Sequence, residues 1–176
     1  LHENSALVIA ELPMKISRTL VSALLVSFAA LTTSIAAEAN RLTAAEQATG
    51  WKLLFDGRSL NGWRGFKKQD APKPGWVVED GMLKKQKGAP GGDIMTEQAF
   101  GDFDLEWEWR LEARGNNGLK YFIIEERGSA IGHEYQMIDD DGHPDGKMGA
   151  KRTTASFYDV LPPVPGKVLK QPGDWN

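Results

Sequence analysis

The chain has 176 residues, with 24 acidic and 21 basic side chains and a formal net charge of −3. Basic and acidic residues alternate and no basic patch stands out, so a nucleic-acid partner is disfavoured and a small neutral or polar ligand is favoured. The chain contains no cysteine. This excludes a disulfide framework and a lipid anchor on an N-terminal cysteine.

Residues 14–39 are typical of a secretory signal peptide. A positive start that includes Lys15 leads into the apolar residues 19–35, which are followed by small alanines. The apolar part is interrupted by serine and threonine, whereas a membrane-spanning helix needs about 20 mainly apolar residues. We therefore expect cleavage after Ala36 or Ala39, no stable membrane insertion, and a periplasmic or extracellular protein.

The remaining segments are a leader, a connector and one domain. Residues 1–13 precede the methionine of the signal peptide, and we expect them to be upstream translation without structure. Residues 40–50 form a linker or short helix, because Thr43 followed by Glu46 matches a capping box. Residues 51–176 are enough for one domain but not two.

Short runs of β type, divided by Gly, Pro, Asn and Asp, recur from residue 51 onward. Several short strands separated by turns indicate an all-β sandwich or barrel. The predicted strands cover residues 52–55, 76–78, 82–84, 93–96, 103–111, 118–125, 134–138 and 156–158.

The clearest strand is residues 103–111, where large apolar side chains occupy every second position. Strict alternation predicts one buried face and one wet face. Trp107 and Trp109 share the apolar face with leucines and a phenylalanine. We therefore assign them to the core rather than to a sugar-stacking surface.

Residues 132–145 carry the strongest indication of function. Glu134 and Gln136 share one face of a predicted strand, and a loop rich in carboxylates follows it. Such loops are where functional groups concentrate. Two structural alternatives stay open: residues 139–141 are either a solvated turn or a site for a hard cation, and His143 before Pro144 either serves the site or caps the loop.

An ordered set of motifs resembles the 3-keto-disaccharide hydrolase family from about Trp51 to Asn176. The motifs are Leu54-Phe55-Asp56-Gly57-Arg58-Ser59-Leu60-Asn61-Gly62-Trp63, Gly92-Asp93-Ile94-Met95-Thr96, Asp102-Phe103-Asp104-Leu105, Asn116-Asn117-Gly118-Leu119-Lys120-Tyr121-Phe122, Glu134-Tyr135-Gln136-Met137-Ile138-Asp139-Asp140, His143-Pro144-Asp145 and Ser156-Phe157-Tyr158-Asp159. The resemblance implies a concanavalin-like jelly-roll sandwich of two antiparallel sheets. It also implies that further strands follow the Gly-Asp-Trp-Asn element at residues 173–176, so we expect the sandwich to be incomplete at its C-terminal end.

The resemblance further implies a carbohydrate-active enzyme that cleaves glycosides already oxidised to a ketone at C3. The ketone acidifies the C2 proton, so a base can remove it and the C1 substituent can leave. Glu134 and His143 are the candidate bases, and Lys120 is the candidate for stabilising the oxyanion. A divalent cation held by Asp140 and His143 is the alternative stabiliser and the candidate cofactor.

Asn117, Gln136 and Arg152 are the residues we expect to bind substrate hydroxyls. Two other functions stay open. One is a non-catalytic carbohydrate-binding module, because the same fold serves lectins. The other is an ordinary glycosidase that uses two carboxylates such as Glu134 and Glu106, which would act on unoxidised glycosides.

Overall fold

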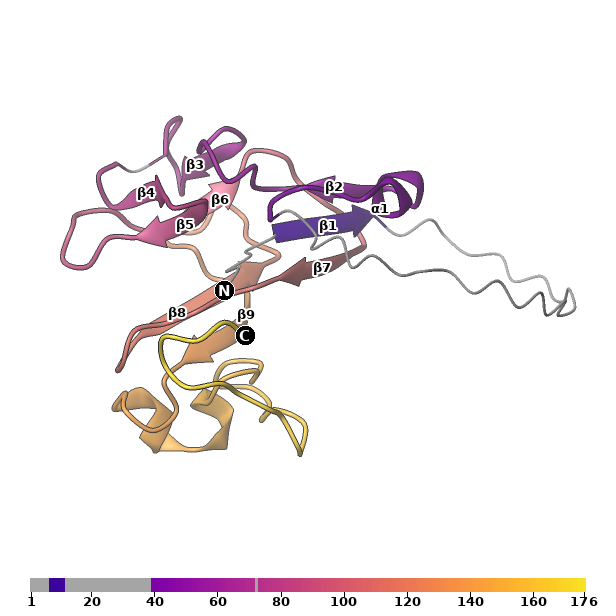
Figure 1. Cartoon of the computed structure of the whole chain (residues 1–176). Coiled ribbons are helices and arrows are strands. Elements are labelled where there is room, and N and C mark those ends of the chain that lie inside the picture. Colours follow the sequence, from indigo (N-terminus) through magenta and orange to yellow (C-terminus); the bar gives the residue numbers. More distant parts are fainter. Residues whose placement is uncertain (1–6, 12–38, 72) are drawn as a thin grey trace, which may run out of the picture.

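The computed structural model describes residues 7–11, 39–71 and 73–176, and the predicted signal peptide lies almost wholly outside them (Figure 1). Within these ranges, no helix is long and apolar enough to cross a membrane. The elements are β1 (Leu7–Glu11), α1 (Ala44–Ala48), β2 (Trp51–Leu53), β3 (Trp63–Gly65), β4 (Trp76–Glu79), β5 (Met82–Lys85), β6 (Ile94–Thr96), β7 (Phe103–Trp107), β8 (Asn116–Tyr121), β9 (His133–Ile138) and the 3-10 turns η1 (Asp145–Met148) and η2 (Ala150–Arg152).

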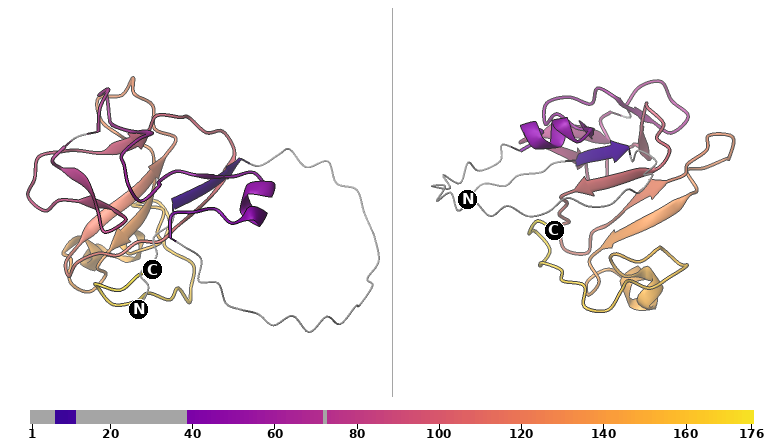
Figure 2. Two further views of the ribbon diagram at one scale, coloured as in Figure 1. Left: turned by 45° about the horizontal axis from the view of Figure 1, so that its top comes forward. Right: turned by 90° about the vertical axis from the view of Figure 1, so that its right-hand side faces the viewer.

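Every strand pair is antiparallel, which confirms the all-β prediction. Hydrogen bonds join β2, β1 and β7 in that order, and they pair β3 with β6, β4 with β5, and β8 with β9. Figure 1 and the right-hand view of Figure 2 show β1, β7, β8 and β9 following one another across the molecule. The arrangement of these ladders as a two-sheet jelly roll stays a prediction.

The short helix α1 begins as the sequence predicts. The Glu46 backbone N–H donates to Thr43 Oγ1 at 3.2 Å, and Glu46 Oε2 accepts from the Thr43 backbone N–H at 2.6 Å. Both halves of the capping box are therefore present.

The prediction that residues 1–13 lack structure is wrong for Leu7–Glu11, which form strand β1 between β2 and β7. The physical reason is the unpaired edge that each of these two strands would otherwise expose. A Leu-Val-Ile run has a high preference for strand, and it satisfies both edges at once.

The alternating face of β7 packs against the β8–β9 hairpin. The Trp107 ring lies 5.0 Å from the Tyr135 ring, and the Phe103 ring lies 6.2 Å from the Tyr121 ring, both edge to face. Trp107 Nε1 also donates to the sulfur of Met137 at 3.4 Å. The partly buried tryptophan thus packs on the hairpin, on the side that its alternation predicts, and these contacts fix one face of the hairpin as the inner face.

The regular strand ends at Trp107, earlier than predicted, but its direction continues. Trp109 exchanges two backbone hydrogen bonds with Asn176, of 2.9 and 2.8 Å, and Gly173 donates to the Leu111 carbonyl at 2.8 Å. The last residues of the chain therefore lie beside residues 109–111.

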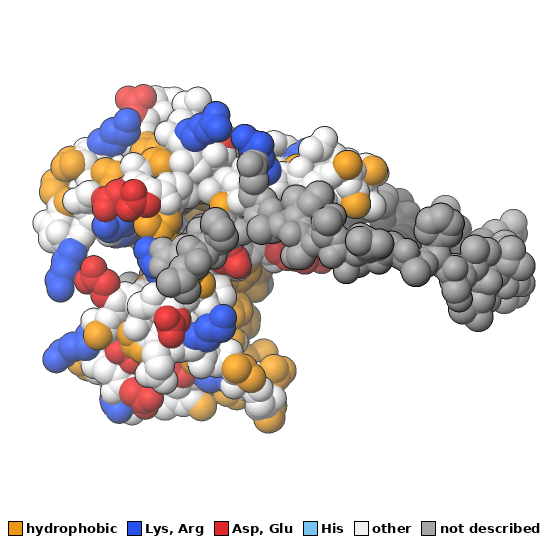
Figure 3. Space-filling view, viewed as in Figure 1, with side chains coloured by type: hydrophobic (Ala, Val, Ile, Leu, Met, Phe, Trp, Pro, Cys, Tyr) orange, Lys and Arg blue, Asp and Glu red, His pale blue; other side chains and the backbone are white. Residues whose placement is uncertain are grey.

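Charged side chains of both signs are scattered over the face shown in Figure 3, in agreement with the mixed-charge composition.

One ion pair ties the loop after β8 to strand β3. Arg64 donates two hydrogen bonds of 2.7 Å to the two carboxylate oxygens of Glu125, and the Lys67 backbone N–H donates a third of 2.8 Å. The bidentate geometry is the stronger form of such pairs. These donors, the Arg64 hydrogen bond above all, lower the pKa of Glu125 to about 2.

We predict that Glu125→Gln weakens the fold at neutral pH and that the difference from wild type disappears in acid. The folded-state pKa is lowered, so the stabilisation is fully present above the unfolded pKa near 4.5 and is lost as the pH falls from there toward about 2. Urea midpoints measured from pH 7 to pH 2 test this. Glu79→Gln is the control, because Glu79 pairs with Lys84 on the surface, and its effect should stay near zero throughout.

Candidate active site

Strand β9 has hydrogen-bonded partners on both of its edges. On one edge it pairs with β8, so that Lys120 lies opposite Glu134 and Gly118 lies opposite Gln136. On the other edge the Tyr158 backbone N–H donates to the Glu134 carbonyl at 3.0 Å. Residues 156–158 therefore run antiparallel beside β9, around an isolated bridge between Tyr135 and Phe157.

This register places Lys120, Glu134 and Tyr158 in one row across three neighbouring segments. Residues directly opposite in an antiparallel pair share a face, with Cβ atoms about 4.5–5.5 Å apart. The face that carries this row is opposite to the inner face of Tyr135 and Met137. An ammonium group, a carboxylate and a phenol thus lie side by side on the face of the hairpin that does not pack on β7.

Glu134 occupies the middle of the row and is half-buried. Burial is the main cause that raises its pKa above the usual range; the positive charge of Lys120 opposes this, and Asp93 and Asp145 add to it. Lys120 Nζ lies 3.7 Å from a carboxylate oxygen of Asp93. A half-buried carboxylate beside a lysine fits a general base with a nearby cationic group for a developing negative charge.

Gly118 makes room for the Glu134 side chain. A Cβ atom at Gly118 would lie 2.6 Å from Glu134 Cδ and 2.8 Å from Glu134 Cγ, closer than real contacts allow. The Glu134 side chain therefore lies across the glycine of the neighbouring strand, and the absence of a side chain there sets its position.

A second group of polar residues lies at the Tyr158 end of the row. The Tyr158 hydroxyl donates to Asp145 Oδ2 at 2.8 Å, and Arg152 donates to Asp145 Oδ1 at 2.7 Å. Arg152 makes two more hydrogen bonds, of 3.1 and 3.2 Å, to Asp159. The guanidinium predicted to bind substrate is thus engaged by two carboxylates, and the structure places it as an organiser of this loop.

Asp93, Asp145 and Tyr158 are the members of this neighbourhood that sequence reasoning did not assign. Asp145 and Tyr158 stand 13 positions apart and meet through a hydrogen bond. Both belong to motifs that the sequence displays, but the motifs do not say which residues touch. The available indication was the alternation that puts Tyr158 on the same strand face as Ser156.

The two predicted amides do not join the row. Gln136 is only 1% exposed, and its Oε1 accepts from the Met137 backbone N–H. Asn117 lies opposite Met137, hence on the other face of the hairpin, and its side chain accepts from the Gly118 backbone N–H. The structure therefore does not bring these two residues together with Glu134.

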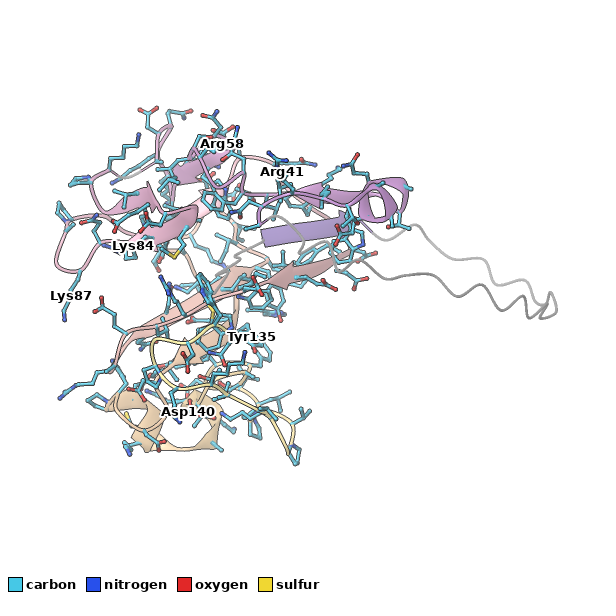
Figure 4. All side chains as sticks on the ribbon, viewed as in Figure 1. Arg41, Arg58, Lys84, Lys87, Tyr135 and Asp140 are labelled. Carbon is cyan, nitrogen blue, oxygen red and sulfur yellow. The ribbon has the colours of Figure 1, made fainter. Side chains whose placement is uncertain are left out.

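The predicted metal ligands do not fit a metal site in this structure. Asp140 Oδ1 accepts from the Thr154 backbone N–H at 2.7 Å, and its Oδ2 accepts from Lys167 Nζ at 2.6 Å. His143 Nδ1 accepts from the Asp145 backbone N–H at 3.1 Å, which is the loop-capping alternative. Figure 4 labels Asp140 just after the end of β9, beside the segment that carries η1 and η2. Over residues 7–11, 39–71 and 73–176, no group of three or more His, Cys, Asp or Glu side chains could hold a metal ion.

The preceding Asp139 also serves the backbone. It accepts from the Arg114 N–H at 2.7 Å, from the Gly142 N–H at 2.8 Å and from the Asp141 N–H at 3.2 Å. These hydrogen bonds, that of Arg114 first, lower its pKa. The aspartates that follow β9 thus mainly stabilise a turn through hydrogen bonds to backbone N–H groups, and they do not form a cluster of free ligands.

The fold and the site define an antiparallel β protein. It carries a half-buried carboxylate, a lysine and a phenol in one row. The chain belongs to the 3-keto-alpha-glucoside-1,2-lyase-like domain family, which it matches over residues 50–176. It is 36% identical to a 3-keto-disaccharide hydrolase of Bacteroides thetaiotaomicron, over 80% of this chain and 55% of that protein. The chain therefore spans about half the length of this curated relative.

A solved structure supports the fold. A protein of Parabacteroides distasonis, assigned provisionally as a glycosyl hydrolase, matches with a TM-score of 0.62 and 30% sequence identity. The match covers 77% of this chain and 66% of that one. The family predicted from the motifs is thus confirmed, and the fold is that of a structural relative.

We predict that Gly118→Ala lowers turnover by displacing the Glu134 side chain. The backbone of Gly118 does not have a positive φ, so its conformation is compatible with alanine. The expected effect comes from the clash between the new Cβ atom and the Glu134 side chain. A misplacement of about 1 Å at a reacting group can reduce the rate by about 10²-fold. Steady-state kinetics on a 3-keto-glycoside, the substrate that the family resemblance implies, measure the loss. Gly128→Ala is the matched control, because nothing lies within 4 Å of its Cβ position; equal activity of the two variants would contradict the prediction.

Proposed function

We propose that this domain cleaves the glycosidic bond of 3-keto-glycosides by elimination, followed by addition of water. The single observation that carries the proposal is the half-buried Glu134 beside Lys120, in a chain that belongs to this family. Elimination next to a ketone needs a base and a group that stabilises an enolate oxygen. The row supplies both.

In the first step a Glu134 carboxylate oxygen takes the proton from C2. The electron pair of the C2–H bond forms the C2=C3 double bond, and the ketone oxygen becomes an oxyanion near the Lys120 ammonium. The enolate then collapses: C1=C2 forms, the ketone returns, and the C1–O bond breaks. Burial of Glu134 favours this role, since a base is most effective when its pKa is near the working pH.

A glycosidase that pairs Glu134 with Glu106 is disfavoured by the geometry. Trp107 packs on the inner face of the hairpin, so Glu106, its neighbour on β7, faces away from it. Glu134 lies on the outer face of the hairpin, beyond Tyr135 and Met137. The two carboxylates are therefore on opposite sides of a packed layer, and one glycosidic bond cannot reach both.

We predict that Glu134→Gln abolishes aglycone release from a 3-keto-glucoside while saturable binding of the sugar remains. Release from the ketone and not from its unoxidised parent, unaffected by EDTA, is the expected wild-type result. Binding without release by wild type would instead identify a carbohydrate-binding module. Release from the unoxidised parent would overturn elimination in favour of ordinary hydrolysis.

The pH dependence of kcat/KM provides a separate prediction. Glu134 must be ionised to act as the base, so the rate should rise with pH through its pKa, which lies above the usual carboxyl range. Lys120→Met removes the charge that lowers this pKa, so the rising limb should move to higher pH and the plateau should fall. Lys151→Met serves as the control, since Lys151 is exposed on η2. An unshifted limb in Lys120→Met would contradict the assignment of the base.

We also propose that the protein is secreted. The support is the charge and hydropathy pattern of residues 14–39, with cleavage after Ala36 or Ala39. N-terminal sequencing of protein recovered from the periplasm or the medium tests this directly.

A further inference from the structure

We propose that Tyr158 is the acid that protonates the departing glycosidic oxygen, and that Asp145 and Arg152 hold it in position. This inference rests on the proposed function, because it assigns the one proton that Glu134 and Lys120 leave unassigned. Elimination produces an alkoxide at the leaving group, and an alkoxide is a poor leaving group unless a proton reaches it.

The position of Tyr158 follows from the strand pairing. Its backbone N–H donates to the Glu134 carbonyl at 3.0 Å, and the flanking bridge joins Tyr135 to Phe157. The two side chains are thus direct cross-strand neighbours on the outer face. Base and acid would approach one sugar ring from adjacent positions, as C2 and the C1 substituent require.

The Tyr158 hydroxyl is oriented by a hydrogen bond but keeps its proton. It donates a hydrogen bond to Asp145 Oδ2 at 2.8 Å, while Asp145 Oδ1 accepts one from Arg152 at 2.7 Å. A hydroxyl can turn to a stronger acceptor, and the developing alkoxide is one. The Arg152 guanidinium lies 5.4 Å from the centre of the Tyr158 ring. The hydrogen bond to Asp145 and burial raise the pKa of Tyr158, and the nearby charge of Arg152 opposes them, so the cation offsets part of the cost of the phenolate that proton transfer leaves behind.

The proton balance closes over the two half-reactions. In elimination, Glu134 gains the C2 proton, and Tyr158 gives its proton to the glycosidic oxygen as the C1–O bond breaks. In hydration, the phenolate takes a proton from the water that attacks C1, and protonated Glu134 returns a proton to C2. Both residues end in their starting states, and the net reaction consumes one water.

Leaving-group dependence is the test. Tyr158→Phe should slow release of methanol from methyl 3-keto-glucoside by about 10²–10⁴-fold, the usual contribution of a general acid. A 4-nitrophenyl aglycone leaves without a proton, so its release should fall by less than about 5-fold. Equal loss with the two aglycones would overturn the role of Tyr158, because a misplaced or unfolded site slows both.

Hydrogen exchange separates this inference from the proposed function. Wild type and Tyr158→Phe should both exchange the C2 proton of methyl 3-keto-glucoside for solvent deuterium, because exchange needs the base and the stabilised enolate but no acid for the leaving group, whereas Glu134→Gln should not. Tyr121→Phe, which removes a phenol hydroxyl from the inner face, should retain both activities. No exchange and no release by wild type would sink the proposed function itself. Exchange by wild type but not by Tyr158→Phe would overturn the assignment of Tyr158 as the acid and would leave the proposed function standing.

Discussion

The site depends on one constraint: strand β9 is hydrogen-bonded on both edges, to β8 and to residues 155–158. A strand in this position cannot slip by one residue without turning its polar row toward the core. The inner contacts with Trp107 fix the other face at the same time. Register and packing therefore agree, and together they determine which side chains stand next to Glu134.

Much of this arrangement could be predicted from short-range pattern. Alternation identifies the inner face of β7 and the division of β9 into two faces, because a strand has a period of two residues. The capping box at Thr43 identifies the start of α1, because it needs only residues three positions apart. The ordered motifs identify the family, since their order and spacing are more specific than any one of them.

What pattern could not supply are contacts between distant residues. Asp140 and Lys167 stand 27 positions apart, and their hydrogen bond removes the carboxylate from the set of free ligands. Strand β3 has three residues in a turn-rich stretch, and it is ordered by β6 about 30 positions later. Gln136 reads as a wet-face residue by alternation. In the structure it is almost completely buried, and its backbone exchanges hydrogen bonds with residues 155 and 156, a pairing that no local feature predicts.

The electrostatics of the outer face divide its two central carboxylates. Desolvation raises the pKa of Glu134, whereas hydrogen bonds from Arg152 and Tyr158 lower the pKa of Asp145, with Arg152 the larger cause. Groups of one chemical type in unlike environments can take unlike roles. Asp145 stays ionised and suits a fixed acceptor that orients a hydroxyl. Glu134 holds a proton more readily and suits the exchange of a proton with carbon. The positive charge of Arg152 lies beside the negative charge of Asp145. Asp145 therefore opposes the ionisation of Glu134 less strongly than an unpaired carboxylate would. Sequence reasoning assigned Arg152 to the substrate, but in the structure it pairs with a carboxylate of the protein itself. This pairing allows Asp145 and Glu134 to lie near each other on the outer face of the hairpin.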